Sequence, residues 1–387
     1  MYNIKTLNKI SPYGLDLFDH AKYRCSDDVE NPDAILVRSA SMHDMELDAS
    51  VVAIARAGAG VNNIPIDKCS EAGICVFNTP GANANAVKEM VLLGLLMGSR
   101  KVADSMEWVK TLKGNGDAVT KLVEKGKGQF VGPEILGKKL GIVGLGAIGV
   151  LVANAAEALG MTVYGYDPYL SVQNAWQLSK NIKHAASLKE IYENCDYITL
   201  HLPATADTKG MINSASIALM KKGVRIINFA RGELVNSADL LENLDNGTVA
   251  AYVTDFPSDD MLMHPGVTAF PHLGASTPES EDNCAKMAAM ELIDYLENGN
   301  IRNSVNFPAA SMPRSAAHRV CIIHKNIVAM LTKISAVMAD SGVNIENLLN
   351  QSRKDYAYTM LDVEEPVSKE AIQKLYEIDG VIKIRVL

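Results

Sequence analysis

Short apolar runs alternate with helical patterns through most of this chain of 387 residues. Near the N-terminus, apolar runs bounded by small or polar residues predict strands at 34–37, 51–56 and 75–78. The segment 85–100 is apolar with helical spacing and predicts a helix that crosses between domains. Strands that alternate with helices are typical of a parallel sheet covered by helices on both faces.

The strand pattern starts again at residue 139. Six strands are expected there, at 139–143, 162–166, 197–202, 224–229, 250–254 and 267–270. They predict a second α/β unit that runs to about residue 274. Thr277, Pro278 and Glu279 then supply an N-cap, a first-turn proline and a first-turn acid. They predict a helix that ends before Gly299.

The C-terminal part follows a different pattern. Its expected elements have the order βαββαβ and cover 319–323, 326–340, 343–352, 356–363, 368–378 and 381–387. This order is that of a ferredoxin-like domain. The sequence therefore predicts an α/β protein with two Rossmann-like parallel-sheet domains and a C-terminal ferredoxin-like domain. The expected boundaries are 1–94 with 275–306, 95–274, a linker at 307–317, and 318–387.

Composition narrows the class of protein. The chain has 37 Lys and Arg against 45 Asp and Glu, a net charge of −8. This balance argues against a partner that is nucleic acid or an anionic membrane. We expect no signal peptide, because the first residues lack an apolar core. Six scattered cysteines without close pairs predict a cytoplasmic protein with reduced thiols and no metal site.

A glycine motif predicts a dinucleotide site. Gly144, Gly146 and Gly149 form GxGxxG between an apolar strand and a helix, and the motif also includes Ala147 and Ile148. These glycines allow a tight turn, close approach of pyrophosphate and close packing of the helix.

Asp167 ends the next strand, 18 residues after Gly149. Its carboxylate is expected to bind the ribose hydroxyls and to repel a 2′-phosphate, which favours NAD over NADP. Other expected cofactor contacts lie at or after later strand ends, at Leu202, Pro203, Ala230, Arg231, Asp255, His272 and Gly274.

Two residues after strand ends are candidates for catalysis. Arg231 can bind a carboxylate with two parallel hydrogen bonds. His272 can accept a proton from a hydroxyl group during hydride transfer. Asp260, or alternatively Asp259, is the acid expected to orient the imidazole. His201 also follows a strand, and we expect a structural role for it.

Together these motifs resemble the D-2-hydroxyacid dehydrogenase family, over residues 35–306. The resemblance implies that Arg231 binds the substrate carboxylate and that His272 is the acid/base. The pairing acid falls on Asp260, where the family normally has glutamate.

Three N-terminal loops are similar to the substrate domain of that family. The residues involved include Arg38 and Ser39, then Ala59, Gly60 and Val61, and finally Asn83. Backbone N–H groups at 59–61 can hold a carboxylate. Arg38 is a candidate phosphate contact, although an ordinary surface position is an alternative.

The C-terminal region resembles an ACT domain found in some members of this family. That resemblance implies NAD-dependent oxidation of D-3-phosphoglycerate to 3-phosphohydroxypyruvate, the first step of L-serine synthesis, and a homodimer or homotetramer. It also places an L-serine effector at His324, Asn326 and Asn344. Val328 and Ala329 replace the usual Pro-Gly, so a domain that serves only dimerisation is the equal alternative.

Two other functions remain open from the sequence. The first is a different NAD-dependent D-2-hydroxyacid dehydrogenase, acting on glycerate or 2-hydroxyglutarate. The second is a non-catalytic protein that senses NAD and an amino acid, supported by the change from glutamate to aspartate at 260.

Overall fold

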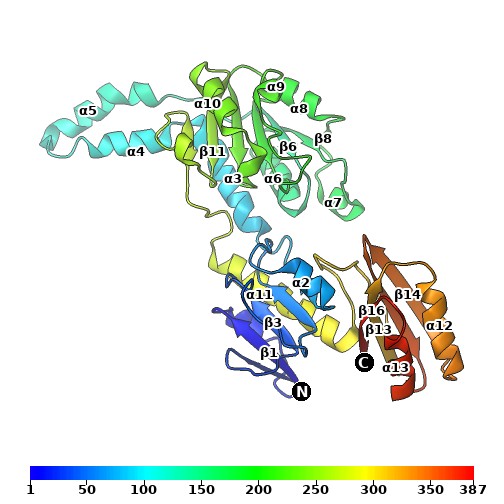
Figure 1. Cartoon of the computed structure of the whole chain (residues 1–387). Coiled ribbons are helices and arrows are strands. Elements are labelled where there is room, and N and C mark those ends of the chain that lie inside the picture. The colour runs from blue at the N-terminus through cyan, green and yellow to red at the C-terminus, as the bar shows by residue number, and fades with distance from the viewer. The chain divides into compact units, whose positions relative to one another are not determined.

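The computed structural model describes all residues from 1 to 387 and divides into two compact units (Figure 1). The discontinuous unit comprises Met1–Asn83 and Pro278–Leu387, and the central unit comprises Ala84–Thr277. The border expected at 94/95 lies inside helix α3 (Ala84–Ser99). This helix lies wholly in the central unit, because its buried residues pack with α6 (Ala147–Ala158) in one core.

The discontinuous unit contains a five-stranded parallel sheet in the order β2-β1-β3-β4-β5. Its strands are β1 (Tyr2–Leu7), β2 (Tyr23–Ser26), β3 (Ala34–Val37), β4 (Ala53–Arg56) and β5 (Cys75–Phe77). The central strands β3, β4 and β5 were predicted, because they are almost fully buried and form apolar runs. The sequence analysis missed β1 and β2, in which only Ile4 and Tyr23 are buried.

Helix α11 (Pro278–Asn298) has the bounds that the capping residues predict. It ends at Gly299, whose φ of +71° is a left-handed conformation that suits glycine. Its small buried face, which includes Ala285 and Ala288, packs in the same core as β3 and β4. The short helices of this region are α1 (Pro12–Leu15) and α2 (Ile66–Glu71).

The C-terminal part of the discontinuous unit forms an antiparallel sheet in the order β14-β15-β13-β16. Its elements follow the predicted βαββαβ order: β13 (His318–Lys325), α12 (Met330–Asp340), β14 (Ile345–Arg353), β15 (Tyr356–Val363), α13 (Lys369–Tyr376) and β16 (Val381–Val386). Helix α12 was expected from 326 but starts at Met330. The preceding residue, Ala329, has φ of +63°, which is incompatible with a right-handed helix.

The segment 307–317, expected from its composition to be a linker, packs into the core. Phe307, Ala310 and Met312 are buried in the cluster that contains the inner face of α11. Ala310 also forms an isolated β-bridge with Ile301. Apolar side chains every two or three residues, rather than the prolines, decide how this segment packs.

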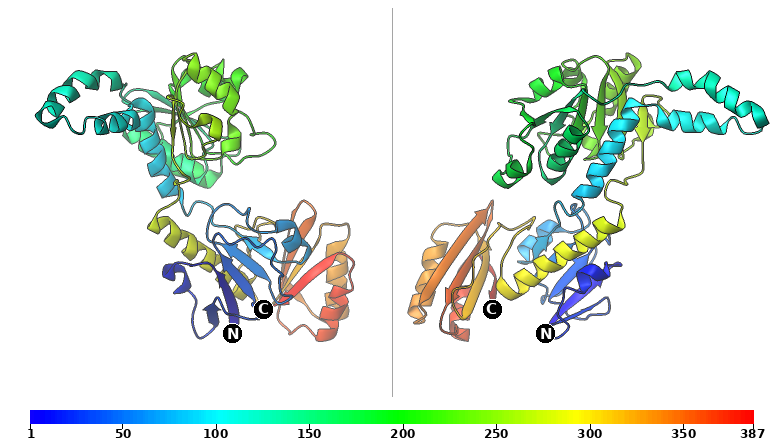
Figure 2. Two further views of the ribbon diagram at one scale, coloured as in Figure 1. Left: turned by 60° about the vertical axis from the view of Figure 1, so that its left-hand side comes forward. Right: turned by 180° about the vertical axis from the view of Figure 1, so that it is seen from behind.

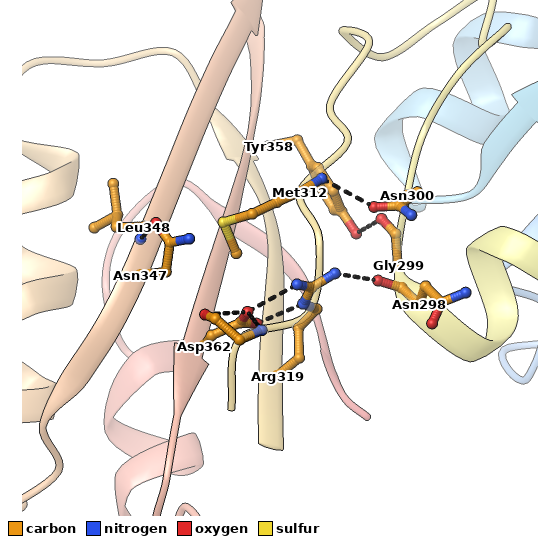
Figure 3. A network of polar contacts seen from close by, with 10 residues as sticks. Asn298, Gly299, Asn300, Met312, Arg319, Asn347, Leu348, Tyr358 and Asp362 are labelled. Atoms are coloured by element: carbon orange, nitrogen blue, oxygen red, sulfur yellow. Dashed lines mark hydrogen bonds and ion pairs between the residues drawn. The ribbon is translucent and has the colours of Figure 1, made fainter. Parts of the chain in front are cut away.

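The last turn of α11 is capped by side chains from the C-terminal sheet (Figure 3). Arg319 Nη1 donates to the Asn298 carbonyl at 2.8 Å, and Tyr358 Oη donates to the Gly299 carbonyl at 2.7 Å. Arg385 donates to the carbonyl groups of Tyr295 and Leu296, each at 3.0 Å. A helix leaves its last carbonyl groups unpaired, and cations stabilise that end. The C-terminal sheet therefore completes α11, and the right view of Figure 2 shows the end of this helix next to that sheet.

The central unit contains a parallel sheet of seven strands in the order β12-β11-β10-β9-β6-β7-β8. The strands are β6 (Lys139–Val143), β7 (Thr162–Tyr166), β8 (Lys183–His184), β9 (Tyr197–Leu200), β10 (Val224–Asn228), β11 (Val249–Thr254) and β12 (Val267–Ala269). Two buried clusters lie on its faces, one with α3 and α6 and the other with α8 (Leu188–Asn194) and α10 (Ser237–Asp245). The remaining helices are α7 (Val172–Gln177), α9 (Ser214–Ile217), η3 (Gly232–Leu234) and η4 (Asp259–Met261).

A helical arm extends from the central unit (Figure 2). It is formed by α4 (Val102–Lys110), η1 (Gly116–Ala118), α5 (Val119–Gly126) and η2 (Lys127–Phe130). Neither α4 nor α5 buries a single residue within the chain. None of the helices is both long enough and apolar enough to cross a bilayer.

Candidate active site

The glycine motif forms the turn between β6 and α6. Gly144 has φ of +95°, and a Cβ atom there would lie 2.5 Å from the His201 carbonyl oxygen. A Cβ on Gly149 would lie 2.0 Å from the Gly144 carbonyl oxygen, whereas a Cβ on Gly146 would meet nothing within 4 Å. The outer glycines are therefore required for packing, and the middle one leaves open space for a ligand to approach the backbone.

Helix α6 begins at this turn without a side-chain cap. The N–H groups of Gly146, Ala147 and Ile148 donate to no acceptor within the chain. Free N–H groups at the start of a helix form a site for phosphate groups. The residues at 144–149 thus fit the pyrophosphate of a dinucleotide.

Asp167 lies directly after β7, next to the glycine turn. Its Oδ2 accepts a hydrogen bond from Leu145 N at 2.8 Å, and its Oδ1 accepts one from Tyr169 N at 2.8 Å. Because both donors are backbone groups, the carboxylate is fixed and each oxygen keeps a further lone pair. This geometry fits the predicted contact with ribose hydroxyls.

Arg231 lies in the turn that follows β10. Asn228, buried at the end of β10, accepts hydrogen bonds from the N–H groups of Ala230 and Arg231 and donates to the Arg231 carbonyl at 2.8 Å. The Arg231 side chain remains exposed. Asn228 is a positioning residue that the sequence analysis did not select. The sequence feature that could have identified Asn228 is a polar residue at the end of an otherwise apolar strand.

Asp255 is a buried acid in the loop that follows β11. It is only 2% exposed, and its Oδ2 accepts a hydrogen bond from Gly274 N at 3.0 Å. Burial raises its pKa, and the nearby charges of His272 and Arg231 act in the opposite direction. Asp255 Oδ1 has no hydrogen-bond partner. Arg231 and His272, from different segments, therefore lie within electrostatic reach of one buried carboxyl group.

His272 lies in the exposed segment between β12 and α11. Its ring packs against Phe256, with the ring centroids 4.6 Å apart. It forms no hydrogen bond or ion pair with Asp260. Instead, Asp260 Oδ1 accepts a hydrogen bond from Ser258 at 2.5 Å, and this bond lowers the pKa of the exposed Asp260 carboxyl. The structure thus does not bring the expected pairing acid to the imidazole.

The segment after β9 contains His201, Leu202 and Pro203. His201 Nε2 lies 3.1 Å from the Thr199 hydroxyl, and burial lowers its pKa to about 4. The ring is therefore neutral near pH 7, in agreement with a structural position. Leu202 borders the glycine turn, because its side chain lies 2.9 Å from the place of a Cβ on Gly144.

The N-terminal candidate residues lie in loops after the adjacent strands β3, β4 and β5. Arg38, directly after β3, forms an ion pair with Glu281 on α11. Ser39 donates its N–H to Asn8 Oδ1 at 3.0 Å. Adjacent parallel strands present their carboxyl ends at one edge, so these loops meet there. Asn83, in the loop after β5, is the last residue of this segment of the discontinuous unit.

The loop after β4 presents a run of free backbone donors. The N–H groups of Ala59, Gly60 and Val61 donate to no acceptor within the chain, and Asn78 Nδ2 holds the Ala59 carbonyl at 2.6 Å. Consecutive free N–H groups form an anion site. The loop therefore has the form expected for binding a carboxylate.

The effector candidates lie on the C-terminal sheet and beside it. His324 is buried, and its ring nitrogens contact the Lys325 carbonyl at 2.8 Å and the Thr359 hydroxyl at 2.9 Å. Burial lowers the pKa of His324. Asn326 donates to the Lys354 carbonyl at 3.1 Å, and Asn344 donates to Glu346 at 2.5 Å. All three side chains are thus engaged within the chain.

Known proteins share this fold and these motifs. Residues 92–274 match the family model of the D-isomer specific 2-hydroxyacid dehydrogenase, NAD binding domain. D-3-phosphoglycerate dehydrogenase of Escherichia coli is 34% identical over 341 residues, which cover 85% of this chain and 79% of that protein. The chain therefore belongs to the D-2-hydroxyacid dehydrogenase family, and its central unit contains the NAD-binding domain.

Two further relatives are similar. D-3-phosphoglycerate dehydrogenase of Bacillus subtilis is 38% identical over 292 residues, which cover 73% of this chain and 53% of that protein. The alignment thus spans about half the length of this relative. The crystal structure of NAD+-bound 3-phosphoglycerate dehydrogenase from Entamoeba histolytica matches with a TM-score of 0.60 and 26% identity, and covers 79% of this chain and 98% of that one.

Proposed function

We propose that this protein oxidises D-3-phosphoglycerate to 3-phosphohydroxypyruvate with NAD. The observation that carries the proposal is that the buried Asp255, after β11, accepts a hydrogen bond from Gly274 N, two residues after His272, while Arg231 follows the adjacent strand β10. A cation for the substrate carboxylate and a base for the hydroxyl proton then serve the same reacting centre. Relatives named D-3-phosphoglycerate dehydrogenase, at 34% and 38% identity, support the choice of substrate.

Each group of residues has its own role in the proposed reaction. The free N–H groups at 146–148 hold the pyrophosphate, and Asp167 holds the ribose. Bound NAD supplies the acceptor for the hydride that leaves the hydroxyl-bearing carbon. Arg231 binds the carboxylate, and His272 takes the hydroxyl proton. Asp255 Oδ1 is a buried acceptor without a donor, which suits an amide N–H₂ of the cofactor.

The loops of the discontinuous unit are assigned to the substrate. The N–H groups at 59–61 supply donors for a carboxylate, with Ser39 and Asn83 in the neighbouring loops. Arg38 is the candidate for the phosphate group. Its ion pair with Glu281 has side chains that are 43% exposed, so exchange of the carboxylate for a phosphate costs little. Asp260 stays a prediction as the acid that pairs with His272.

The C-terminal sheet is assigned as an ACT domain, supported by its βαββαβ order and its antiparallel strand order. Regulation by L-serine at His324, Asn326 and Asn344 stays a prediction. Binding there requires a new donor or acceptor at His324, whose two nitrogens already have partners. Adding L-serine to the NADH consumption assay described below tests the predicted regulation.

The assay for the proposed function is NADH consumption with 3-phosphohydroxypyruvate. We expect kcat/KM for this substrate to exceed that for hydroxypyruvate by at least about 10-fold, because a hydrogen-bonded charge contributes about 1.5–3 kcal/mol. A higher kcat/KM for hydroxypyruvate or 2-oxoglutarate would assign a different dehydrogenase. NADH binding without turnover of any of the three would favour the sensing protein.

We also propose that the protein is a homodimer or homotetramer. Support comes from the helical arm, in which Met106 and Val109 are exposed and no residue of α4 or α5 is buried. A helix pair in which no residue is fully buried needs another surface for its exposed apolar side chains. Sedimentation equilibrium of the full chain is expected to give two or four times the mass of 41.7 kDa. A monomer at micromolar concentration would contradict this.

A further inference from the structure

The loop after β4 contains two peptide units whose carbonyl groups are held by the loop after β5. Thr79 N donates to the Gly58 carbonyl at 3.1 Å. Asn78 Nδ2 donates to the Ala59 carbonyl at 2.6 Å. In a trans peptide unit, the N–H group points in the opposite direction from the carbonyl group of the preceding residue. Each hydrogen bond therefore fixes the direction of one free N–H group, that of Ala59 or that of Gly60.

The two hydrogen bonds differ in the group that supplies the donor. The donor of Thr79 is a backbone N–H, which any residue except proline supplies at that position. The donor of Asn78 is a side-chain amide, and the Ala59 carbonyl accepts no other hydrogen bond within the chain. The direction of the Gly60 N–H group thus depends on one side chain.

Gly60 makes the peptide unit between residues 59 and 60 easy to turn over. Turning this unit over changes the φ of residue 60 by about 180°. The φ of Gly60 is not positive in the structure, so the turned-over unit gives it a positive φ, which glycine tolerates. That unit directs the Ala59 carbonyl to the side where the Gly60 N–H group was. A carbonyl oxygen carries partial negative charge and repels a carboxylate.

Asn78 is itself fixed by the segment that follows α11. The Asn303 carbonyl accepts a hydrogen bond from Asn78 N at 3.3 Å, and Phe77 forms an isolated antiparallel bridge with Ser304. Asn303 Nδ2 donates at 2.5 Å to Oε1 of Glu291, which lies on the buried face of α11. Glu291 Oε2 is buried and has no partner. These contacts hold the backbone of Asn78 in place after the edge strand β5.

In the proposed function, on which this inference rests, the N–H groups at 59–61 hold the substrate carboxylate. We propose that Asn78 is a positioning residue for that carboxylate, because its side-chain amide keeps the Gly60 N–H group directed at the anion. Asn78 touches no reacting atom and acts through the peptide unit that it holds. The carboxylate is present in the substrate and in the transition state alike, so we expect an effect on KM rather than on kcat.

The first variant is Asn78→Ala, which removes the amide from a half-buried position. We expect KM for the preferred 2-oxo acid to rise by about 3-fold to 10-fold, the size of one net hydrogen bond, with kcat within about 2-fold. The Kd for NADH should stay the same, because the glycine turn at 144–149 belongs to the central unit. A lower kcat with an unchanged KM would indicate loss of active protein only, and would overturn the proposal.

Gly60→Ala tests whether Asn78 acts through this peptide unit. A Cβ on Gly60 would lie 3.6 Å from Asn62 Oδ1 and 3.7 Å from Arg56 Nη1, which are ordinary contacts. Alanine disfavours a positive φ and therefore disfavours the turned-over unit. In the Gly60→Ala background, Asn78→Ala should raise KM by less than about 2-fold. An equal rise in both backgrounds would overturn the proposal.

Asn347→Ala is the matched control, because Asn347 is exposed on β14 and its Oδ1 accepts a hydrogen bond only from Leu348 N, at 2.9 Å. It should change KM by less than about 2-fold. The measurements use whichever of 3-phosphohydroxypyruvate, hydroxypyruvate and 2-oxoglutarate has the highest kcat/KM, because all three have a carboxylate next to the carbonyl group. Preference for another acid would correct the proposed substrate and leave the test of Asn78 valid. An unchanged KM in Asn78→Ala would overturn the role of Asn78 alone.

Discussion

Replacement of His272 with alanine is expected to lower kcat by about 100-fold to 10,000-fold, the usual contribution of a general base. His272 is exposed between β12 and α11, two residues before Gly274, whose N–H donates to the Asp255 carboxyl. Loss of the ring removes the proposed proton acceptor but leaves the glycine turn at 144–149, the proposed pyrophosphate site, unchanged. The Kd for NADH should therefore stay within about threefold, which corresponds to under 1 kcal/mol.

The measurement pairs steady-state kinetics with NADH fluorescence titration. His184→Ala is the matched control, because His184 is exposed on β8, away from Asp255. This control should keep the kcat of the unaltered protein. A His272→Ala protein with full kcat would remove His272 from the mechanism, and a loss of NADH binding of the same size would reduce its role to cofactor binding.

The second large effect is expected for the buried ion pair between Arg319 and Asp362, next to the last turn of α11. Arg319 donates to Asp362 through Nε at 2.6 Å and Nη2 at 2.8 Å, and both side chains are 0% exposed (Figure 3). Asp362→Asn leaves the guanidinium buried without its counter-charge. We expect a loss of about 3–5 kcal/mol in the stability of the C-terminal sheet.

Hydrogen exchange of the β13 and β15 amides measures this loss directly, because it reports the opening of one part of a larger chain. Glu107→Gln removes an exposed partner of Lys110 and should change stability by less than about 1 kcal/mol. Equal exchange rates in Asp362→Asn and the unaltered chain would refute the expected role of the pair.

The Arg319–Asp362 pair also makes the stability of the folded chain depend on pH. Burial opposes ionisation of Asp362, but the hydrogen bonds from Arg319 and Ser315 outweigh it and lower the pKa. Because the pKa of Asp362 is lower in the folded chain, its ionised form stabilises the folded chain at pH values above the ordinary aspartate pKa of about 4. The contribution is then lost as the pH falls through the lowered pKa of the folded state.

Local sequence patterns predicted the central sheet well. The strands at 139–143 and 162–166 have the expected bounds, because each is a short apolar run that stops at glycine or acid. Helix α11 also has the expected bounds, because its proline and its closing Gly299 lie within the sequence itself. Strands β1 and β2 were missed, since they are largely unburied and carry few apolar side chains.

The site was predicted less completely than the fold. Asp167, Arg231 and His272 were chosen because each follows a strand, and the structure places them at the edge where strands end. Asn228 was not chosen, although its side chain holds the turn that carries Arg231. Its function depends on hydrogen bonds to a turn, and no periodic pattern encodes those.

The sequence alone determined where the chain turns, which faces are apolar and which residues carry a dinucleotide motif, because these properties depend on neighbours a few positions apart. Only the tertiary structure decided which polar groups meet. It joined Asp255 to Gly274 and left Glu291 Oε2 without a donor. The physical reason is that a hydrogen bond requires two groups within about 3 Å, and segments far apart in the chain reach that distance only after the core has packed.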